Sequence, residues 1–247
     1  MQTFIFDTYE LMASKAAEFI AGTVTKKGDS LLCFAAGDTP TGIFRCLANM
    51  QKQGRVDFGQ SSFIGLDEWV GVNRQEDGGC MNYMYAHLFE PLGIEDSNIV
   101  FFDAASGDLQ QECVKVDEYV REHGPIDLML LGIGMNGHLG LNEPGVREDL
   151  HSHIVDLDPV TKTVAQKYFK NVRSLEKGIT LGIRDIMEAK CVVLIVSGAK
   201  KAEIMKEIME GGITNALPAS LVKNHGNALL FMDRDAASLL DNRGDIV

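Results

Sequence analysis

The chain has 247 residues, 45% of them hydrophobic, and its 35 acidic against 23 basic side chains give a formal net charge of −12. This length accommodates one large domain or two small ones. So acidic a surface repels phosphate backbones, which argues against a nucleic-acid partner. An anionic small substrate is compatible only with a local basic site.

The N-terminus has no basic segment followed by an apolar core, and no run approaches the roughly 18 apolar residues that span a bilayer. We therefore expect no membrane partner and no secretion. Five widely spaced cysteines without a CxxC pair argue against a disulfide framework and a structural zinc site. Together these features predict a protein of the reducing cytoplasm.

Short apolar runs alternate with segments of helical spacing along the chain. The expected strands are residues 3–6, 31–35, 62–66, 99–102, 128–132, 192–196 and 229–232, and the expected helices are 9–25, 42–53, 81–89, 109–122, 179–188 and 200–209. Several runs are apolar on both faces, as in a parallel sheet covered on both sides. The pattern predicts an α/β fold, in which one domain (1–247) has an open, doubly wound, mostly parallel sheet with helices on both faces.

Residues 144–177, called the lid segment below, form the least regular and most polar stretch. The segment comes soon after the expected strand 128–132, and ligands of open α/β sheets bind outside the carboxyl ends of strands. We expect a lid over the site, with a surface insertion as the alternative. Its His151 and His153 have no evident third ligand, so no metal is expected.

Gly37, Asp38 and Thr39 follow an expected strand and precede a helix that begins near Pro40. The N–H groups of such a turn and the helix dipole favour phosphate. Gly37 would let a phosphate approach the backbone. The alternative is that Asp38 or Thr39 simply caps the helix.

Asp67 and Glu68 are adjacent carboxylates at the end of the expected strand 62–66. Alternation along a strand sends them to opposite sides, so they do not form a catalytic pair. A partly desolvated Asp67 would have the raised proton affinity that a general base needs. A capping or turn carboxylate is the alternative.

The strongest signal is LLGIGMNGHLGLNEP, residues 130–144, in which an apolar strand runs into a loop with four glycines. Glycines at this density permit close approach of a substrate to the backbone. His138 lies two residues after Asn136 and five before Glu143, an arrangement that indicates an acid–base imidazole held in one tautomer. A structural histidine is the alternative.

Lys200 and Lys201 lie in the first turn of a helix that follows the expected strand 192–196. The positive end of a helix dipole disfavours cations there, so a bound anion would explain them. Two solvated surface lysines are the alternative.

These motifs, with GITLGI (178–183) and ALPASLVKNH (216–225), resemble in order the glucosamine-6-phosphate deaminase/isomerase family. The same superfamily includes 6-phosphogluconolactonases and sugar-sensing domains of bacterial regulators. The motifs LDEW and NGHLGLNEPG are closer to the galactosamine-6-phosphate isomerase branch. The resemblance implies an isomerase that deaminates galactosamine 6-phosphate, or next glucosamine 6-phosphate, without cofactor or metal, and yields a ketohexose 6-phosphate and ammonia.

The resemblance also assigns roles. It makes Asp67 the base that moves a proton from C2 to C1, His138 the ring-opening residue and Glu143 its partner. The family usually reads Asp-Gly-His where this chain has Asn136 before Gly137. An Asn carbonyl can hold an imidazole but cannot stabilise an imidazolium as Asp does. Either Glu143 carries the charge, or the branch tunes its histidine differently, or the reaction is altered.

For the phosphate, the resemblance implies the backbone of Gly37, Asp38 and Thr39, together with Lys201. Lys167 in the lid segment takes the place of a family Arg, which keeps the charge but loses the bidentate fork.

Two other functions compete with this reading. One is a hydrolase of the 6-phosphogluconolactonase type. The other is a non-catalytic sugar-phosphate sensor, disfavoured because the sheet begins within the first ten residues and leaves no room for a DNA-binding helix pair. The sequence leaves open the C4 configuration of the sugar, allosteric regulation and whether the chain forms a homo-oligomer.

Overall fold

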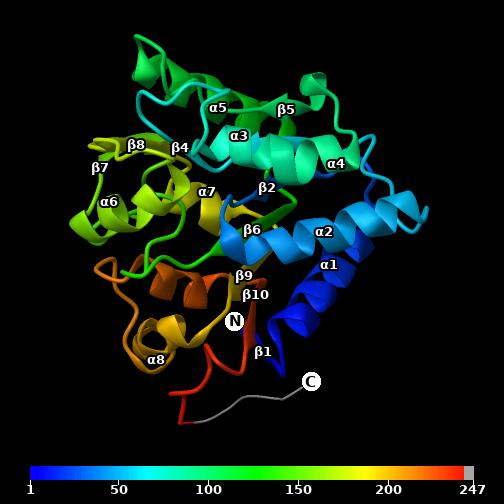
Figure 1. Cartoon of the computed structure of the whole chain (residues 1–247), viewed down its shortest axis with the longest axis vertical. Helices are drawn as coiled ribbons and strands as arrows, with labels where there is room; N and C mark the ends of the chain where they lie inside the picture. Colours follow the sequence, from blue (N-terminus) through cyan, green and yellow to red (C-terminus); the bar gives the residue numbers. More distant parts are fainter. Residues whose placement is uncertain (242–247) are drawn as a thin grey trace.

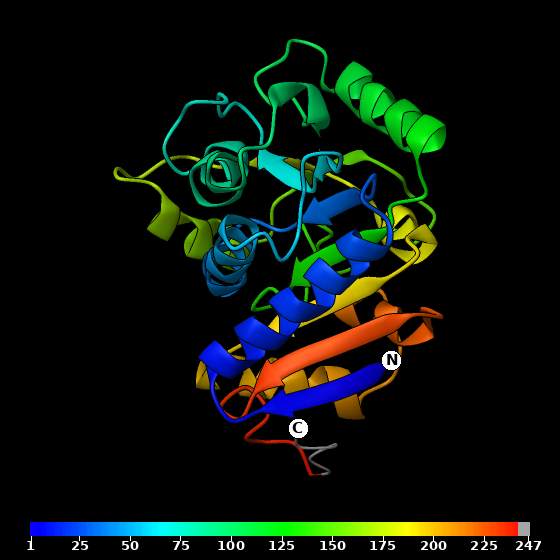
Figure 2. The ribbon, with the colours of Figure 1, turned by 90° about the vertical axis from the view of Figure 1, so that its right-hand side faces the viewer.

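The computed structural model describes residues 1–241, which contain a central sheet of seven parallel strands (Figure 1). In spatial order the strands are β1 (Gln2–Phe6), β10 (Ala228–Asp233), β9 (Val192–Val196), β6 (Leu128–Gly132), β2 (Leu31–Phe34), β3 (Ser62–Gly65) and β5 (Ile99–Val100). Figure 2 shows β1 and β10 side by side at one edge, with α1 (Tyr9–Lys26) lying across the sheet.

Helices cover both faces of this sheet. One face carries α1, α2 (Asp38–Lys52) and the consecutive segments α3 (Cys80–Met84), η1 (Tyr85–Phe89) and α4 (Glu90–Leu92). The other carries α5 (Leu109–His123), α7 (Ile183–Glu188), η4 (Ala199–Lys201), α8 (Ala202–Glu210) and η5 (Pro218–Asn224).

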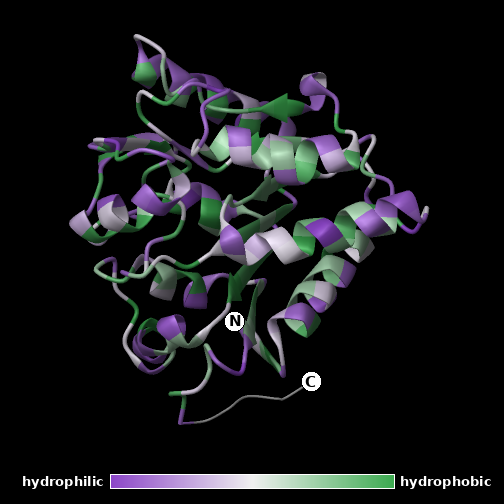
Figure 3. Ribbon diagram, in the orientation of Figure 1, coloured by the Kyte–Doolittle hydropathy of each residue, from purple (hydrophilic) through white to green (hydrophobic). Residues whose placement is uncertain are grey.

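Strand β6 shows how the two hydrophobic cores are divided. Leu128 and Leu130 pack into the core on the first face, whereas Met129 and Leu131 pack into the core on the second. Figure 3 shows the resulting pattern, with hydrophobic strands between helices that carry both hydrophobic and hydrophilic residues. The predicted doubly wound α/β fold is confirmed.

A second, antiparallel sheet was not predicted. It consists of β4 (Asp67–Trp69), β8 (Lys177–Thr180) and β7 (His153–Asp156), in the order β4-β8-β7. The expected helix 179–188 is therefore wrong at its start, because Ile179 and Thr180 pair with β4 and α7 begins only at Ile183. Gly182 allows the chain to pass from β8 into α7 at this point, since a Cβ there would lie 2.0 Å from the carbonyl oxygen of Leu150.

The lid segment is more regular than its sequence indicates. It contains β7, α6 (Pro159–Ala165) and the single turn η3 (Gln166–Tyr168). Ion pairs join it to the rest of the molecule: Lys167 to Asp38, and Lys170 to Asp77. A polar segment acquires this order because β7 pairs with β8 and because charged side chains find partners outside the segment.

Within residues 1–241 no helix has the length and apolar character needed to cross a membrane. The five cysteines carry free thiols.

Candidate active site

The order of the strands places a crevice at the carboxyl ends of the strands in the central sheet. From β2 the chain moves outward to β3 and β5, then returns to the other side of β2 with β6, β9 and β10. Such a reversal opens a crevice at the carboxyl ends of the strands. Gly37 follows β2 and Asp67 follows β3. His138 follows β6, and Lys201 follows β9. Because these four strands are adjacent and parallel, the four groups lie at the same end of the strands.

His138 is held by groups on both sides of its ring. Its Nδ1 lies 3.3 Å from Oε2 of Glu143 and 3.1 Å from Oγ1 of Thr161. The ring lies against Gly134, where a Cβ would be 2.3 Å from Nε2. Burial alone would raise the pKa of Glu143, but contacts with His138, Thr161 and Asn136 lower it. Glu143 is therefore an ionised carboxylate beside the imidazole.

Asn136 contacts the carboxylate and the backbone, not the imidazole ring. Its Nδ2 donates to Oε2 of Glu143 at 2.9 Å, and its Oδ1 accepts from the backbone N–H of His138 at 3.3 Å. Of the three interpretations of the Asn, the geometry favours the one in which Glu143 carries the charge. An amide suits this position because it donates a hydrogen bond to Glu143, which a carboxylate does not.

Asp67 is buried in β4 beside the thiol of Cys80. Burial, together with the negative charge of Glu68, raises the pKa of Asp67 to about 7. A carboxyl group that exchanges its proton near neutral pH can serve as both acid and base. Thr180, its register partner in β8, accepts a hydrogen bond from the backbone N–H of Leu141 at 3.2 Å. This contact joins the strand of Asp67 to the glycine-rich loop, residues 132–143.

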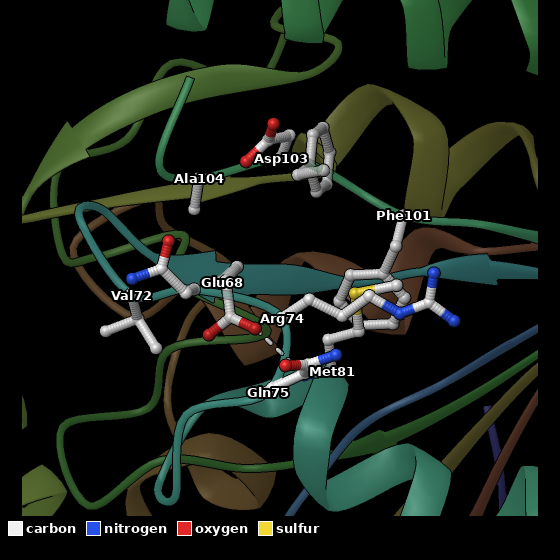
Figure 4. Close-up of a pocket in the computed structure, with 10 residues that line it drawn as sticks. Glu68, Val72, Arg74, Gln75, Met81, Phe101, Asp103 and Ala104 are labelled. Carbon is white, nitrogen blue, oxygen red and sulfur yellow. Dashed lines mark hydrogen bonds between the residues drawn. The ribbon is translucent and has the colours of Figure 1, made fainter. Parts of the chain in front are cut away.

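Glu68 serves the fold instead. It accepts hydrogen bonds at 2.8–2.9 Å from the backbone N–H groups of Trp69, Cys80 and Met81, so that it caps the first turn of α3. It lines a cavity of about 390 Å³ between residues 72–75 and 101–104 (Figure 4). Asp67 does not line this cavity, which agrees with the predicted divergence of the two side chains.

Hydrogen bonds from two tyrosines hold the turn after β2. Gly37 is the N-cap of α2 with a φ of 128°, a conformation that favours glycine. Tyr83 Oη donates to the carbonyl of Gly37, and Tyr9 Oη donates to that of Thr39, both at 2.9 Å. The alternative, in which Asp38 or Thr39 caps the helix, is wrong, because no side chain caps α2. The fixed turn presents the amino end of α2, where the dipole favours an anion.

Two lysines flank this turn. Lys167 pairs with the side chain of Asp38 at 2.7 Å. Lys201 donates from Nζ to the carbonyl of Ile133 in the glycine-rich loop. Burial, together with the positive charge of Lys167, lowers the pKa of Lys201 to about 8. Lys200 is exposed, as a solvated lysine would be. The arrangement can bind a phosphate between the turn and the loop.

The sequence reasoning missed Thr161 and Tyr168. Thr161 is 23 residues from His138 and reaches it only because α6 folds over the loop. The Tyr168 hydroxyl lies 3.3 Å from where a Cβ on Gly37 would be, so this ring covers the turn. Neither residue belongs to a motif, and no local pattern indicates such long-range contacts.

The lid-segment histidines have hydrogen-bond partners within the protein. His151 Nδ1 lies 2.5 Å from Oδ1 of Asp185, and His153 Nδ1 bonds the carbonyl of His151 at 2.9 Å. Among the residues that the structure describes, no three side chains of metal-binding type gather at one point.

Comparison with known proteins agrees with this fold. The model of the family described as glucosamine-6-phosphate isomerases/6-phosphogluconolactonase matches residues 7–231. Glucosamine-6-phosphate deaminases from Thermoanaerobacter sp. (strain X514) and Halothermothrix orenii are 35% and 36% identical over 241 residues, covering 97% of this chain and 95% and 100% of theirs. A solved monomeric glucosamine-6-phosphate deaminase superposes with a TM-score of 0.94 at 33% identity, covering 97% of this chain and 100% of that one.

A 6-phosphogluconolactonase from Trypanosoma brucei shares the fold, with a TM-score of 0.70 at 18% identity, over 97% of this chain and 99% of that one. The chain therefore belongs to the family of glucosamine-6-phosphate isomerases and 6-phosphogluconolactonases.

Proposed function

We propose that the protein isomerises and deaminates a 2-amino-2-deoxyhexose 6-phosphate, releasing a ketohexose 6-phosphate and ammonia. The observation that carries this proposal is Asp67, a carboxyl group with a pKa of about 7 whose strand is joined to the loop of His138 and Glu143. Full-length relatives named glucosamine-6-phosphate deaminase support it.

In the proposed mechanism His138 takes the proton of the anomeric hydroxyl and gives a proton to the ring oxygen, which opens the sugar. Glu143 stabilises the imidazolium formed in between. Asp67 then removes the C2 proton while the aldehyde oxygen O1 takes up a proton from solvent, which leaves an enol bearing the amino group. Return of that proton to C1 gives an iminium at C2, and water hydrolyses it to the ketone and ammonia.

The phosphate would lie at the amino end of α2, against the backbone of Gly37, Asp38 and Thr39. Lys167 and Lys201 would supply the positive charge. Since burial lowers the pKa of Lys201 to about 8, we expect phosphate binding to weaken as the pH rises above 8.

The base is tested by Asp67→Asn. We expect this variant to fold and to release no ammonia in a coupled assay, whereas Asp57→Asn, which changes an exposed carboxylate, keeps normal turnover. Near-normal turnover by Asp67→Asn would refute the assignment of the base.

The same variant has a predictable stability. Because the pKa of Asp67 is raised in the fold to about 7, wild type loses stability as the pH rises from about 4 to 7. Asn does not ionise, so we expect Asp67→Asn to be more stable than wild type at pH 8, by up to about 4 kcal/mol, and similar at pH 4. Thermal unfolding at both values measures this.

The configuration at C4 is a separate prediction. The motifs LDEW and NGHLGLNEPG favour the galacto epimer, whereas the names of the relatives favour the gluco epimer. Ammonia release from both 6-phosphates decides between them, and a ratio of kcat/KM near one or in favour of gluco would overturn the galacto preference. Lactone hydrolysis without ammonia release would instead favour the hydrolase.

A further inference from the structure

We propose that Thr161, carried by the lid segment, is a positioning residue whose hydroxyl links His138 to Glu143 and so makes ring opening depend on a docked lid segment. This inference rests on the proposed function for its kinetic consequence. The residue touches the histidine rather than the sugar.

The first observation is the geometry around Nδ1 of His138. The direct distance from Nδ1 to Oε2 of Glu143 is 3.3 Å, longer than most N–H···O bonds, which measure about 2.7–3.2 Å. Thr161 Oγ1 is closer, at 3.1 Å. A hydroxyl group both accepts and donates hydrogen bonds. Thr161 can therefore accept a hydrogen bond from Nδ1–H of His138 and donate one to the carboxylate of Glu143. Thr161 thus completes a link that the two other residues make poorly by themselves.

The second observation is that α6 also binds the other oxygen of Glu143. The backbone N–H of Asp158, the N-cap residue of α6, donates to Oε1 of Glu143 at 3.2 Å. Asn136 donates to Oε2 from within the glycine-rich loop. The carboxylate that orients the imidazole is therefore held jointly by the loop and by the start of a lid-segment helix.

The third observation is that the same segment reaches the phosphate turn. Lys167 follows α6 directly and pairs with Asp38. A short stretch of chain thus contacts both ends of the crevice: the phosphate turn through Lys167 and the acid–base histidine through Thr161. Docking of this stretch at the phosphate end would bring the Thr161 hydroxyl to His138.

Thr161→Val removes the hydroxyl group but keeps the packing of the side chain. Thr161 is buried at 3% exposure, and Val has the same branched shape without the oxygen. Thr161→Ser retains the oxygen and loses a methyl group. Thr163→Val is the matched control, because Thr163 lies on the same helix, is exposed and donates only to the carbonyl of Pro159.

We expect Thr161→Val to lower kcat for ammonia release about 10- to 100-fold, less than the roughly 100- to 10,000-fold that an acid–base group itself contributes, and to leave KM within about twofold. Thr161→Ser should remain within about threefold of wild type, and Thr163→Val should match it. The open-chain amino-hexitol 6-phosphate needs no ring opening, so all variants should bind it with the wild-type Kd. An unchanged kcat in Thr161→Val, or equal losses in the Ser and Val variants, would overturn the proposal.

A second readout separates positioning from a displaced lid segment. If Thr161→Val also weakened the binding of the hexitol phosphate, the loss would come from misplacement of Lys167, and the positioning role would be wrong. In ¹⁵N-labelled protein we expect an Nδ1–H signal of His138, protected from exchange with water in wild type and Thr161→Ser and lost in Thr161→Val. This signal does not depend on turnover. Absence of ammonia release from wild type would refute the proposed function, whereas an Nδ1–H signal indifferent to Thr161→Val would refute this inference.

Discussion

At the residue scale, the histidine of the site has one carboxylate partner, and a neutral amide holds that partner in place. Asn136 donates to Glu143, while Glu143 faces His138. The sequence predicted both Asn136 and Glu143 as neighbours of His138 but left open whether Glu143 carries the charge. Sequence spacing contains no information on which oxygen faces the ring, because that depends on how the loop closes.

We expect Asn136→Asp to be destabilising at pH 8, by about 1–3 kcal/mol, because it replaces a donor by a second carboxylate 2.9 Å from Oε2 of Glu143. At pH 5 the loss should be smaller, since the two carboxylates can share a proton there. Thermal unfolding at both pH values measures this. Asn171→Asp adds the same charge at an exposed position and should have no such effect. Equal stability of Asn136→Asp and wild type at pH 8 would contradict the interpretation.

At the scale of elements, long apolar runs were predicted correctly and short polar strands were not. The strand around Leu130 is apolar on both faces because both faces pack into a core, so its pattern is independent of its neighbours. Strands β4, β7 and β8 have three or four residues each and include His, Asp, Glu and Lys. They exist because they pair with one another, and no local preference indicates that pairing.

The glycine-rich loop gives an element-scale prediction. A Cβ at Gly134 would overlap the ring of His138, with distances of 2.3–2.5 Å to ring atoms. We expect Gly134→Ala to lower kcat/KM at least about 100-fold, since a displacement near 1 Å has this effect on acid–base geometry. Gly107→Ala, where a Cβ meets nothing within 4 Å, is the control. Wild-type activity of Gly134→Ala would show that the ring position does not matter.

At the scale of the whole molecule, the proposed site forms because adjacent parallel strands have their carboxyl ends on the same side of the sheet. Four neighbouring strands are followed by Gly37, Asp67, His138 and Lys201. Gly37 and Lys201 are nevertheless 164 positions apart in the sequence (201 − 37). The net charge of −12 makes local positive charge essential for an anionic substrate. Whether the chain forms a homo-oligomer stays a prediction; one solved relative is described as monomeric.

This convergence can be tested through ligand-linked stability. Inorganic phosphate should raise the Tm of wild type at pH 7, because a ligand that binds only the folded state stabilises it. We expect Lys201→Met to lose this rise and Lys200→Met, which changes the exposed neighbour, to keep it. For wild type the rise should shrink above pH 8, where Lys201 loses its charge. A full phosphate effect in Lys201→Met would place the anion elsewhere.

By itself the sequence determined the central sheet and the two-sided helical cover, and it predicted the segments that we propose to carry chemistry. These features depend on the periodicity of apolar residues and on local turn chemistry, and both are determined by residues close together in the sequence. Only the tertiary structure decided the second sheet, the orientation of Asn136 toward Glu143 and the contact of Thr161 with His138. Such contacts join residues distant in the chain, and their energy arises only when packing has excluded water and brought the partners within hydrogen-bond distance.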